Sequence, residues 1–290
     1  MKHDYTLWFN AKKDAETLVI VLAGYKDFLW DKVFDRFKKY VPSVYDVCIL
    51  SSGRFDDTLL RIAKDNDWTY MSTDVNNLCL AQNLCLEYFD KAKYVFKMDE
   101  DIFVTKDSFA TMLDSYKMAD RHTSYEVGFV VPQMNVNCVT YHRLLQLRGL
   151  FRQFRDTVGN IKITNGLHHN KHILENPEMA KFMWTYFDID DPTLVSSTFD
   201  LVPCPVRFSI GMILFERSTW EAMGKFTVEL DAKEEYKRIG MGTDEKDICK
   251  YAMMKAKPLM IDRRVLVGHF SYGPQTATMK EFFKEHPEKF

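Results

Sequence analysis

The sequence has no excess of positive charge and no long apolar run. Its 290 residues include 39 Lys and Arg against 41 Asp and Glu, a formal net charge of -2. Because a surface that binds nucleic-acid phosphates needs a clear basic excess, we expect no nucleic-acid partner. No stretch of about 18 uncharged apolar residues occurs, so the sequence predicts no transmembrane segment.

The sequence also lacks paired cysteine spacings and an apolar leader. Its six cysteines lie apart in apolar segments, without the C-x-x-C or zinc-finger pattern of a metal site. The first residues, MKHDYTLWFNAKKDAE, contain no apolar stretch of a signal peptide. We therefore expect a cytoplasmic protein with reduced, buried thiols.

Strand-like and helix-like segments alternate over the first hundred residues. The segment TLVIVLAGY, which begins at Thr17, has the pattern of a strand buried on both faces, and YDVCILSSG, WTYMST and AKYVFKM repeat it. Apolar residues at helical spacing separate these segments, and Pro42 ends the first helix. The alternation predicts an α/β fold with a mostly parallel sheet, whose ligands bind at the carboxyl ends of the strands.

The second half is less regular. We expect a helix over about residues 106–116, a strand in VGFVVPQMNV and a mainly helical insertion over residues 136–202. Basic residues from Arg143 to Arg155 alternate with apolar ones, as in a solvated helix or in an amphipathic surface that contacts a membrane peripherally. The strand pattern returns in VRFSIGMILFERSTW, PLMID and RVLVGHF, with a helix in DEKDICKYAMMKA.

Three consecutive carboxylates follow the fourth strand, in YVFKMDEDIFV. Asp99, Glu100 and Asp101 repel one another, and at the end of a buried strand they have little access to water. We expect a cation to compensate them, and a metal ion is the leading candidate. A D-x-D triplet is common in acidic loops, but a preceding strand and helix series makes it more specific.

From about Thr17 to Gly273 the order of elements and motifs resembles a D-x-D-type, nucleotide-sugar-dependent glycosyltransferase of the GT-A fold, similar to family 2. The resemblance implies a Rossmann-like central sheet flanked by helices. It further implies that Asp99 and Asp101 hold Mn²⁺ or Mg²⁺ and that Asp99 and Glu100 face the donor. A divalent cation there would stabilise charge on the leaving diphosphate.

The resemblance divides the single domain, residues 1–290, into three parts. Residues 1–135 form the half that binds the nucleotide-sugar, residues 136–202 the insertion, and residues 203–290 the acceptor half with a C-terminal metal ligand. In the last part, VLVGHFSYG places His269 where many GT-A enzymes supply that ligand. Imidazole beside carboxylates suits manganese.

Two segments resemble donor-binding parts of the family. Helix DVNNLCLAQNLCLEYF and the loop after the first strand supply the candidate donor contacts, which are Asn76, Asn77, Gln82, Asn83, Ala23, Tyr25 and Asp27. An equally open interpretation makes Asn76 an N-cap and places Gln82 on a solvated helix face.

Two further segments resemble acceptor-side motifs. In RFSIGMILFERSTWEAMGKF, Gly211 lets substrate approach the backbone, and a glycine in a strand by itself indicates close approach or a bulge. GMGTDEKDICKYAM resembles the acidic motif that supplies the base of inverting members, which gives Glu245 first and Asp244 second. The family order is more often Glu-Asp, and acidic residues also suit a helix N-terminus. The choice between Glu245 and Asp244 as the base stays open.

We thus expect a metal-dependent transfer of sugar, from a UDP-sugar in family habit, to a hydroxyl of a glycan or glycoconjugate, with inversion, as in polysaccharide biosynthesis. One alternative is a nucleotide- or carbohydrate-binding protein without catalysis. Another is a sugar nucleotidyltransferase, which has a glycine-rich loop after the first strand, whereas LAGYKDFLW contains one glycine.

Overall fold

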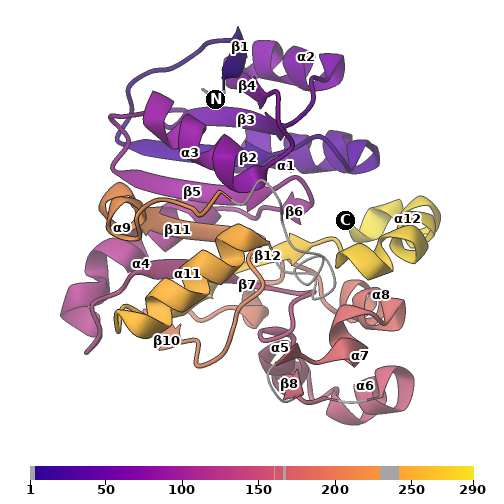
Figure 1. Cartoon of the computed structure of the whole chain (residues 1–290). Coiled ribbons are helices and arrows are strands. Elements are labelled where there is room, and N and C mark those ends of the chain that lie inside the picture. Colours follow the sequence, from indigo (N-terminus) through magenta and orange to yellow (C-terminus); the bar gives the residue numbers. More distant parts are fainter. Residues whose placement is uncertain (1–3, 160, 166–167, 229–241) are drawn as a thin grey trace.

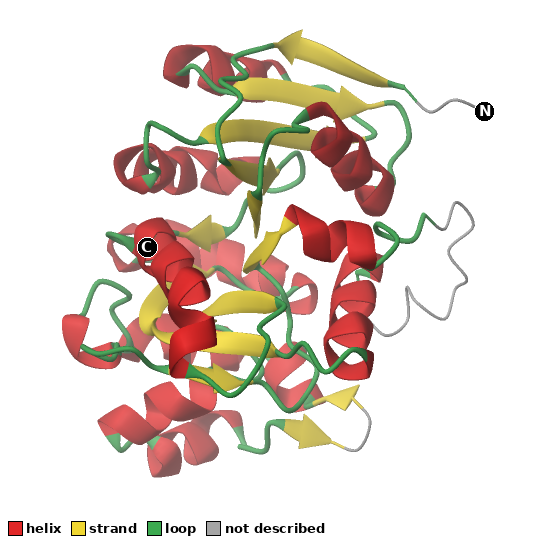
Figure 2. Cartoon of the chain, turned by 90° about the vertical axis from the view of Figure 1, so that its left-hand side faces the viewer, coloured by secondary structure: helices red, strands yellow, loops and turns green. Residues whose placement is uncertain are grey.

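A twisted sheet with helices on both faces forms the centre of the molecule (Figure 1). The computed structural model describes residues 4–159, 161–165, 168–228 and 242–290. Within these ranges ten strands form one sheet in the order β1-β4-β3-β2-β5-β11-β7-β12-β10, and β6 pairs with β12 outside this path. Figure 2 shows the helices on both sides of the strands, which confirms the predicted α/β class.

The first half of the sheet is parallel, as predicted. Its four parallel strands are β2 (Thr17–Leu22), β3 (Asp46–Ser52), β4 (Thr69–Thr73) and β5 (Tyr94–Asp99). β2 lies between β3 and β5, and every residue of β2 and β3 is buried. Such continuous burial is typical of parallel strands that are covered on both faces.

Capping residues set the ends of the helices in this half. These helices are α1 (Trp30–Tyr40), α2 (Asp57–Asn66), α3 (Leu78–Tyr88) and α4 (Ser108–His122). α1 ends two residues before Pro42, as predicted. The side chain of Asp56 accepts hydrogen bonds from the backbone N–H groups of Thr58 and Leu59 at the start of α2. These bonds satisfy donors that a helix start leaves unpaired.

Opposite faces of β5 contact different helices. The ring of Phe96 packs against Phe109 of α4 with 5.1 Å between centroids. The next residue, Lys97, reaches Asp244 of α11 (Thr243–Met254). Since neighbouring residues of a strand point to opposite faces, α4 and α11 cover different sides of the sheet. α3 and α11 lie together on the same side (Figure 1).

The second half of the sheet is mixed. Its strands are β6 (Ile102–Phe103), β7 (Phe129–Met134), β10 (Leu201–Pro203), β11 (Met212–Glu216) and β12 (Leu259–His269). β11 runs antiparallel between β5 and β7 and leads into α9 (Arg217–Ala222), while β12 is parallel to β7. The strand predicted in VRFSIGMILFERSTW begins only at Met212, because residues 206–211 form a loop beside the sheet end.

The structure departs from the predicted strands in two places. PLMID and RVLVGHF are not two short strands but one, β12, whose register with β7 shifts between Asp262 and Leu266. The polar side chains at this irregularity interrupt the apolar pattern, and Asp262 Oδ1 accepts a hydrogen bond from the backbone N–H of Arg264. The edge strand β1 (Tyr5–Phe9), antiparallel to β4, was not predicted because its alternation is weak.

The described part of residues 136–202 contains four α-helices, a short strand pair and, before β10, the 3₁₀ helix η2 (Pro192–Leu194). The α-helices and the strand pair are α5 (Tyr141–Arg148), α6 (Phe151–Val158), β8 (Thr164–Asn165), β9 (His168–His169), α7 (Lys171–Leu174) and α8 (Pro177–Tyr186). The C-terminal helix α12 (Thr276–Glu285) packs beside α8. Trp184 of α8 donates from Nε1 to the carbonyls of His269 (3.2 Å) and Phe270 (3.0 Å). Helix α8 therefore supports the end of β12.

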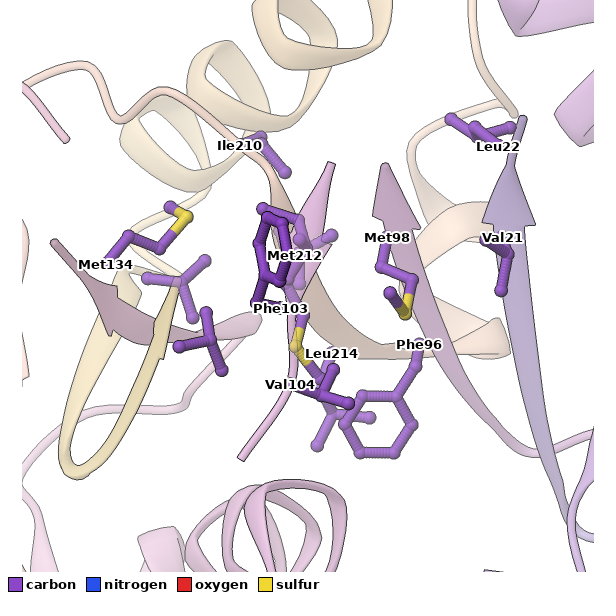
Figure 3. Close-up of a cluster of buried hydrophobic side chains, with 14 of the residues drawn as sticks. Val21, Leu22, Phe96, Met98, Phe103, Val104, Met134, Ile210, Met212 and Leu214 are labelled. Carbon is purple, nitrogen blue, oxygen red and sulfur yellow. The ribbon is translucent and has the colours of Figure 1, made fainter. Parts of the chain in front are cut away.

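Apolar packing holds the carboxyl ends of the central strands in place. Met98 of β5, Met212 and Leu214 of β11 and Met134 of β7 are fully buried in one cluster (Figure 3).

All six cysteines are free, and four of them are buried. Among the described helices, none combines the length and the apolar character needed to cross a membrane.

Candidate functional site

A cavity of about 320 Å³ opens at the carboxyl ends of β2, β3, β5 and β12. Segments far apart in the sequence form its walls: the loop after β2, the turn after β5, residues 209–211 before β11, and the start of α11. Most of the candidate residues lie along it. The position is the one expected for a ligand site in an α/β sheet.

Asp101 and His269 lie side by side in the lining of this cavity. Asp101 Oδ2 lies 3.6 Å from His269 Nε2 and forms an ion pair with Lys26 Nζ. His269 Nδ1 lies 2.6 Å from the carbonyl oxygen of Val136. A carbonyl only accepts, so Nδ1 carries the proton and the lone pair of Nε2 points toward Asp101. Asp101 Oδ2 and His269 Nε2 are both hydrogen-bond acceptors, so they repel each other unless a cation lies between or beside them.

The ionisation of this pair follows from burial and charge. Burial lowers the pKa of His269 below its ordinary value, which keeps the imidazole neutral. Burial acts to raise the pKa of Asp101, but the neighbouring ammonium of Lys26 outweighs it and holds the pKa below the ordinary value. A neutral imidazole and an ionised carboxylate are both in the state that binds a metal.

Asp99 belongs to a second charge network. Its Oδ1 lies 2.9 Å from Lys97 Nζ, and Lys97 also lies 3.4 Å from Asp244 Oδ2. Burial raises the pKa of Asp99 to about 6, against the opposing effect of Lys97. Burial alone would lower the pKa of Lys97, but the two carboxylates outweigh it and raise the pKa. Lys97 therefore joins the turn after β5 to the start of α11.

Glu100 points away from its two neighbours. Its carboxylate accepts hydrogen bonds from the backbone N–H groups of Gly24 (2.9 Å) and Tyr25 (2.8 Å) and from Trp30 Nε1 (2.6 Å). These three bonds anchor the loop after β2 to the D-x-D turn. Each of the three carboxylates thus has a protein partner: Lys97 for Asp99, Lys26 for Asp101, and N–H donors for Glu100.

The loop after β2 presents an aromatic ring. Tyr25 is 58% exposed, its hydroxyl donates to the carbonyl of Ser52 (2.8 Å), and Arg54 lies over its ring. Ala23, Tyr25 and Ser52 line the cavity. Asp27 lies in the short helix η1 (Asp27–Leu29), is exposed and is not part of the cavity wall.

The candidate residues at the start of α3 and within it have different environments. Asn77 is the N-cap, through a bond from Leu80 N to its side chain (2.9 Å), whereas Asn76 is exposed. Gln82 is buried rather than solvated and donates to Asp244 Oδ2 (3.2 Å). The structure places none of these side chains on the cavity wall.

Asn83 also lies away from the cavity. Its amide nitrogen donates to the carbonyl of Phe226 (2.8 Å), and its oxygen accepts from Phe226 N and Trp220 Nε1 (3.0 Å each). All of these partners come from the segment after β11. The side chain therefore anchors that segment to α3 instead of facing a ligand.

Gly211 lines the cavity, but its missing side chain is explained by packing. A Cβ atom at this position would lie 2.5 Å from Ile102 Cδ1 and 3.1 Å from Met134 Sδ. Its carbonyl accepts a hydrogen bond from Asp99 N (2.9 Å). The glycine thus allows β6 to approach the start of β11, and the space that the sequence assigns to substrate is filled by Ile102.

Replacing Gly211 with alanine is expected to lower the free energy of unfolding by about 1–3 kcal/mol, the usual effect of overpacking a buried site. Denaturant unfolding measures the loss. The same substitution is expected to cost less in an Ile102→Val background, which lacks the clashing methyl group. Gly273→Ala is the matched control, because nothing lies within 4 Å of the added atom. Equal losses at both glycines would contradict the packing explanation.

The two candidate bases differ in environment. Asp244 is 3% exposed, and Lys97 and Gln82 both contact its Oδ2. Glu245 is 9% exposed and forms an ion pair with Arg207 Nε. Both residues line the same cavity as the D-x-D turn. Asp244 thus contacts Lys97 of β5, whereas Glu245 pairs with Arg207 in the loop before β11.

Lys26, Lys97 and Arg207 were absent from the predicted site. Strand alternation contains a signal for Lys97, since a residue two positions before Asp99 shares its face. Lys26 directly follows Tyr25 in a loop that the sequence already singles out. Arg207 lies in a loop without a pattern, and no local signal indicates its contact with Glu245.

The donor set fits a divalent cation in part. Within the described part of the chain, no three His, Cys, Asp or Glu side chains are grouped closely enough to hold a metal by themselves. Asp101 and His269 converge, while Asp99 turns to Lys97. Mg²⁺-like cations are commonly bound by one or two protein ligands together with substrate phosphates and water. The pair of Asp101 and His269 meets that requirement.

No protein-family model and no curated protein matches the sequence. Solved structures do match. The mannosyltransferase PcManGT from Pyrobaculum calidifontis, in complex with GDP-Man and Mn²⁺, is 15% identical with a TM-score of 0.50, over 93% of this chain and 61% of that one. GalNAc-T7 with UDP, GalNAc and Mn²⁺ is 11% identical with a TM-score of 0.51, over 95% and 51%. S. aureus TarS is 12% identical with a TM-score of 0.50, over 93% and 39%.

This chain therefore spans less than two thirds of each of these proteins. The likeness extends over nearly all of this chain. At such low identity it establishes architecture. The chain has the GT-A fold of the nucleotide-sugar glycosyltransferases.

Proposed function

We propose that this chain is a glycosyltransferase that moves a sugar from a nucleoside-diphosphate donor to a hydroxyl of a glycan or glycoconjugate. The observation that carries the proposal is that Asp101, His269, Lys26 and Glu245 line one cavity. The first three offer metal ligands and a cation for a diphosphate, and Glu245 offers a carboxylate for a hydroxyl. Complexes of two proteins with this fold, one with GDP-Man and one with UDP, support this donor class.

The donor half of the proposal rests on the loops after β2 and β3. In it the nucleoside, uridine by family habit, lies against Tyr25, Ala23 and Ser52. The hydrogen bond from Tyr25 to the carbonyl of Ser52 joins the two loops, and Glu100 holds the first of them in place. Residues 1–135 then serve as the donor half and residues 203–290 as the acceptor half.

Asp101 and His269, with Asp99 as a third ligand, would hold Mn²⁺ or Mg²⁺. When bound, the cation supplies stabilisation of the negative charge on the leaving diphosphate. His269 is oriented for this role by Val136, since the bond at Nδ1 leaves Nε2 directed toward Asp101. Trp184 contributes indirectly by bonding the carbonyl of His269.

Glu245 is the proposed base. Its carboxylate accepts the proton of the acceptor hydroxyl while the hydroxyl oxygen attacks the anomeric carbon. The bond to the diphosphate breaks on the opposite face, so the configuration inverts. Arg207 orients the carboxylate. Asp244 is the second candidate, but its contacts with Lys97 and Gln82 favour a positioning role. Polysaccharide assembly in the cytoplasm, with peripheral membrane contact, is the proposed setting.

Release of nucleoside diphosphate from a panel of UDP- and GDP-sugars, with Mn²⁺, Mg²⁺ or EDTA, tests this function. We expect slow, metal-dependent hydrolysis of one donor in the absence of acceptor. Tight binding of a sugar nucleotide without any release, with or without glycan acceptors, would instead identify a binding protein. Neither binding nor release from the whole panel would overturn the proposal.

Binding of Mn²⁺ is expected to weaken as the pH falls through about 6, the pKa to which burial raises Asp99. A carboxyl with a raised pKa takes up its proton at higher pH, and the proton then competes with the cation. The lowered pKa of His269 keeps that ligand neutral over the same range. Calorimetric titrations at several pH values measure the effect, and Asp99→Asn is expected to flatten it. An affinity independent of pH in the unaltered protein would exclude Asp99 as a ligand.

A further inference from the structure

Lys26 competes for the oxygen that a cation would use. Its Nζ forms an ion pair with Asp101 Oδ2, and this is the oxygen that faces His269 Nε2. The side chain of Asp101 is 2% exposed, whereas that of Lys26 is 25% exposed. Asp101 is therefore enclosed by protein, and Lys26 reaches it from the open side of the cavity.

A dication and this ammonium cannot share Asp101 Oδ2. Both would contact one oxygen, which places three positive charges within a few ångströms in a poorly solvated pocket. His269 offers no compensation, because an imidazole carries no negative charge, and Asp99 is already paired with Lys97. A bound cation must therefore displace the ammonium of Lys26.

A diphosphate gives the displaced ammonium a new partner. Lys26 lines the same cavity as Tyr25, Asp99 and Asp101. Its flexible stem carries a compact charge that binds phosphate oxygens well. Without a diphosphate, displacement of Lys26 breaks its ion pair with Asp101 and leaves the ammonium in water. With a bound diphosphate, an ion pair between Lys26 and the phosphates replaces the lost one.

We propose that Lys26 is an exchangeable counterion that pairs with Asp101 in the metal-free protein and moves to the donor diphosphate when a divalent cation binds. The inference rests on the proposed function. It predicts that metal and diphosphate bind cooperatively beyond their direct contact, because the diphosphate removes the competitor of the metal. Lys26 thereby disfavours a metal-loaded site that holds no donor.

Titrations of Mn²⁺ without nucleotide and with saturating UDP or GDP test the inference, with free Mn²⁺ followed by electron paramagnetic resonance. Lys26→Met is expected to bind Mn²⁺ alone at least about tenfold more tightly than the unaltered protein. The enhancement of Mn²⁺ affinity by UDP is expected to fall by a similar factor. Lys26→Arg keeps the charge and is expected to behave like the unaltered protein. Lys32→Met, in an exposed part of α1, is the matched control.

Each outcome decides one question. If Lys26→Met shows unchanged Mn²⁺ affinity and unchanged enhancement by UDP, the inference is overturned while the proposed function stands. If the unaltered protein binds neither Mn²⁺ nor a nucleoside diphosphate, the proposed function itself fails. If Lys26→Met does not fold, reductive methylation of the unaltered protein replaces it. Mn²⁺ alone is then expected to speed modification of Lys26 and added UDP to slow it again, and no change on adding Mn²⁺ would overturn the inference.

Discussion

Replacing Asp101 with asparagine is expected to lower metal-dependent release of nucleoside diphosphate by at least about a thousandfold, since a Lewis-acidic cation contributes several kcal/mol. Asparagine keeps the size of the side chain but removes the charge that Lys26 and a cation both require. The measurement is steady-state release of the nucleoside diphosphate from the donor that the panel identifies. The substitution is also expected to remove most of the Mn²⁺ affinity.

Asp107→Asn is the control for this change. Asp107 lies six residues further on, is exposed and makes no capping hydrogen bond to α4. Its replacement is expected to leave release within twofold of the unaltered protein, as expected for a surface substitution. If Asp101→Asn retains full metal-dependent activity, the D-x-D turn does not hold the metal. The assignment of Asp101 and His269 would then be withdrawn.

Replacing Glu245 with glutamine is expected to reduce kcat by about 10²–10⁴, the usual contribution of a general base. Binding of the donor and of Mn²⁺ is expected to change by less than about threefold, because Glu245 pairs with Arg207 and is not among the proposed metal ligands. The kcat is measured by release of the nucleoside diphosphate with water or an identified glycan as acceptor. Calorimetry measures donor binding.

Asp244→Asn separates the second candidate from the first. This change removes one of two carboxylate partners of buried Lys97, so we expect a loss of about 3 kcal/mol in the free energy of unfolding. Glu245→Gln is expected to cost much less, because its partner Arg207 is more exposed. If Asp244→Asn abolishes turnover without loss of stability while Glu245→Gln retains it, Asp244 is the base.

The buried network around Lys97 links the two halves of the candidate site. Lys97 contacts Asp99 on β5 and Asp244 on α11, and Gln82 of α3 contacts the same Asp244 oxygen. Because a buried charge requires partners, these contacts hold the start of α11 at a set position against the D-x-D turn. The distance between the D-x-D turn and the start of α11 is thereby defined by the protein before any ligand binds.

Local patterns in the sequence were sufficient for the main elements. Continuous apolar runs marked β2 and β3, helical spacing with Pro42 marked α1, and the D-x-D triplet lay at the end of β5 as predicted. Each of these signals lies within a few residues of the feature that it indicates. His269 was also placed correctly at the end of a strand, since an apolar run leads directly into it.

Contacts between distant segments were decided only by the tertiary structure. Glu100 binds Gly24 and Tyr25, Asn83 binds Phe226, and Arg207 binds Glu245, and no local pattern encodes which partner such a side chain meets. The single strand β12 was missed for the same reason, because pairing with β7 carries it across polar residues that interrupt its apolar run.

The sequence by itself therefore determined the α/β class, the parallel strands of the first half and the presence of three adjacent carboxylates at the end of one of them. The tertiary structure alone decided that these carboxylates separate into three roles: Asp101 with His269 and Lys26, Asp99 with Lys97, and Glu100 with the loop after β2. The reason is physical. Strand alternation sets the face on which a side chain emerges, but burial forces each charge to find a partner, and those partners come from elements far away in the chain.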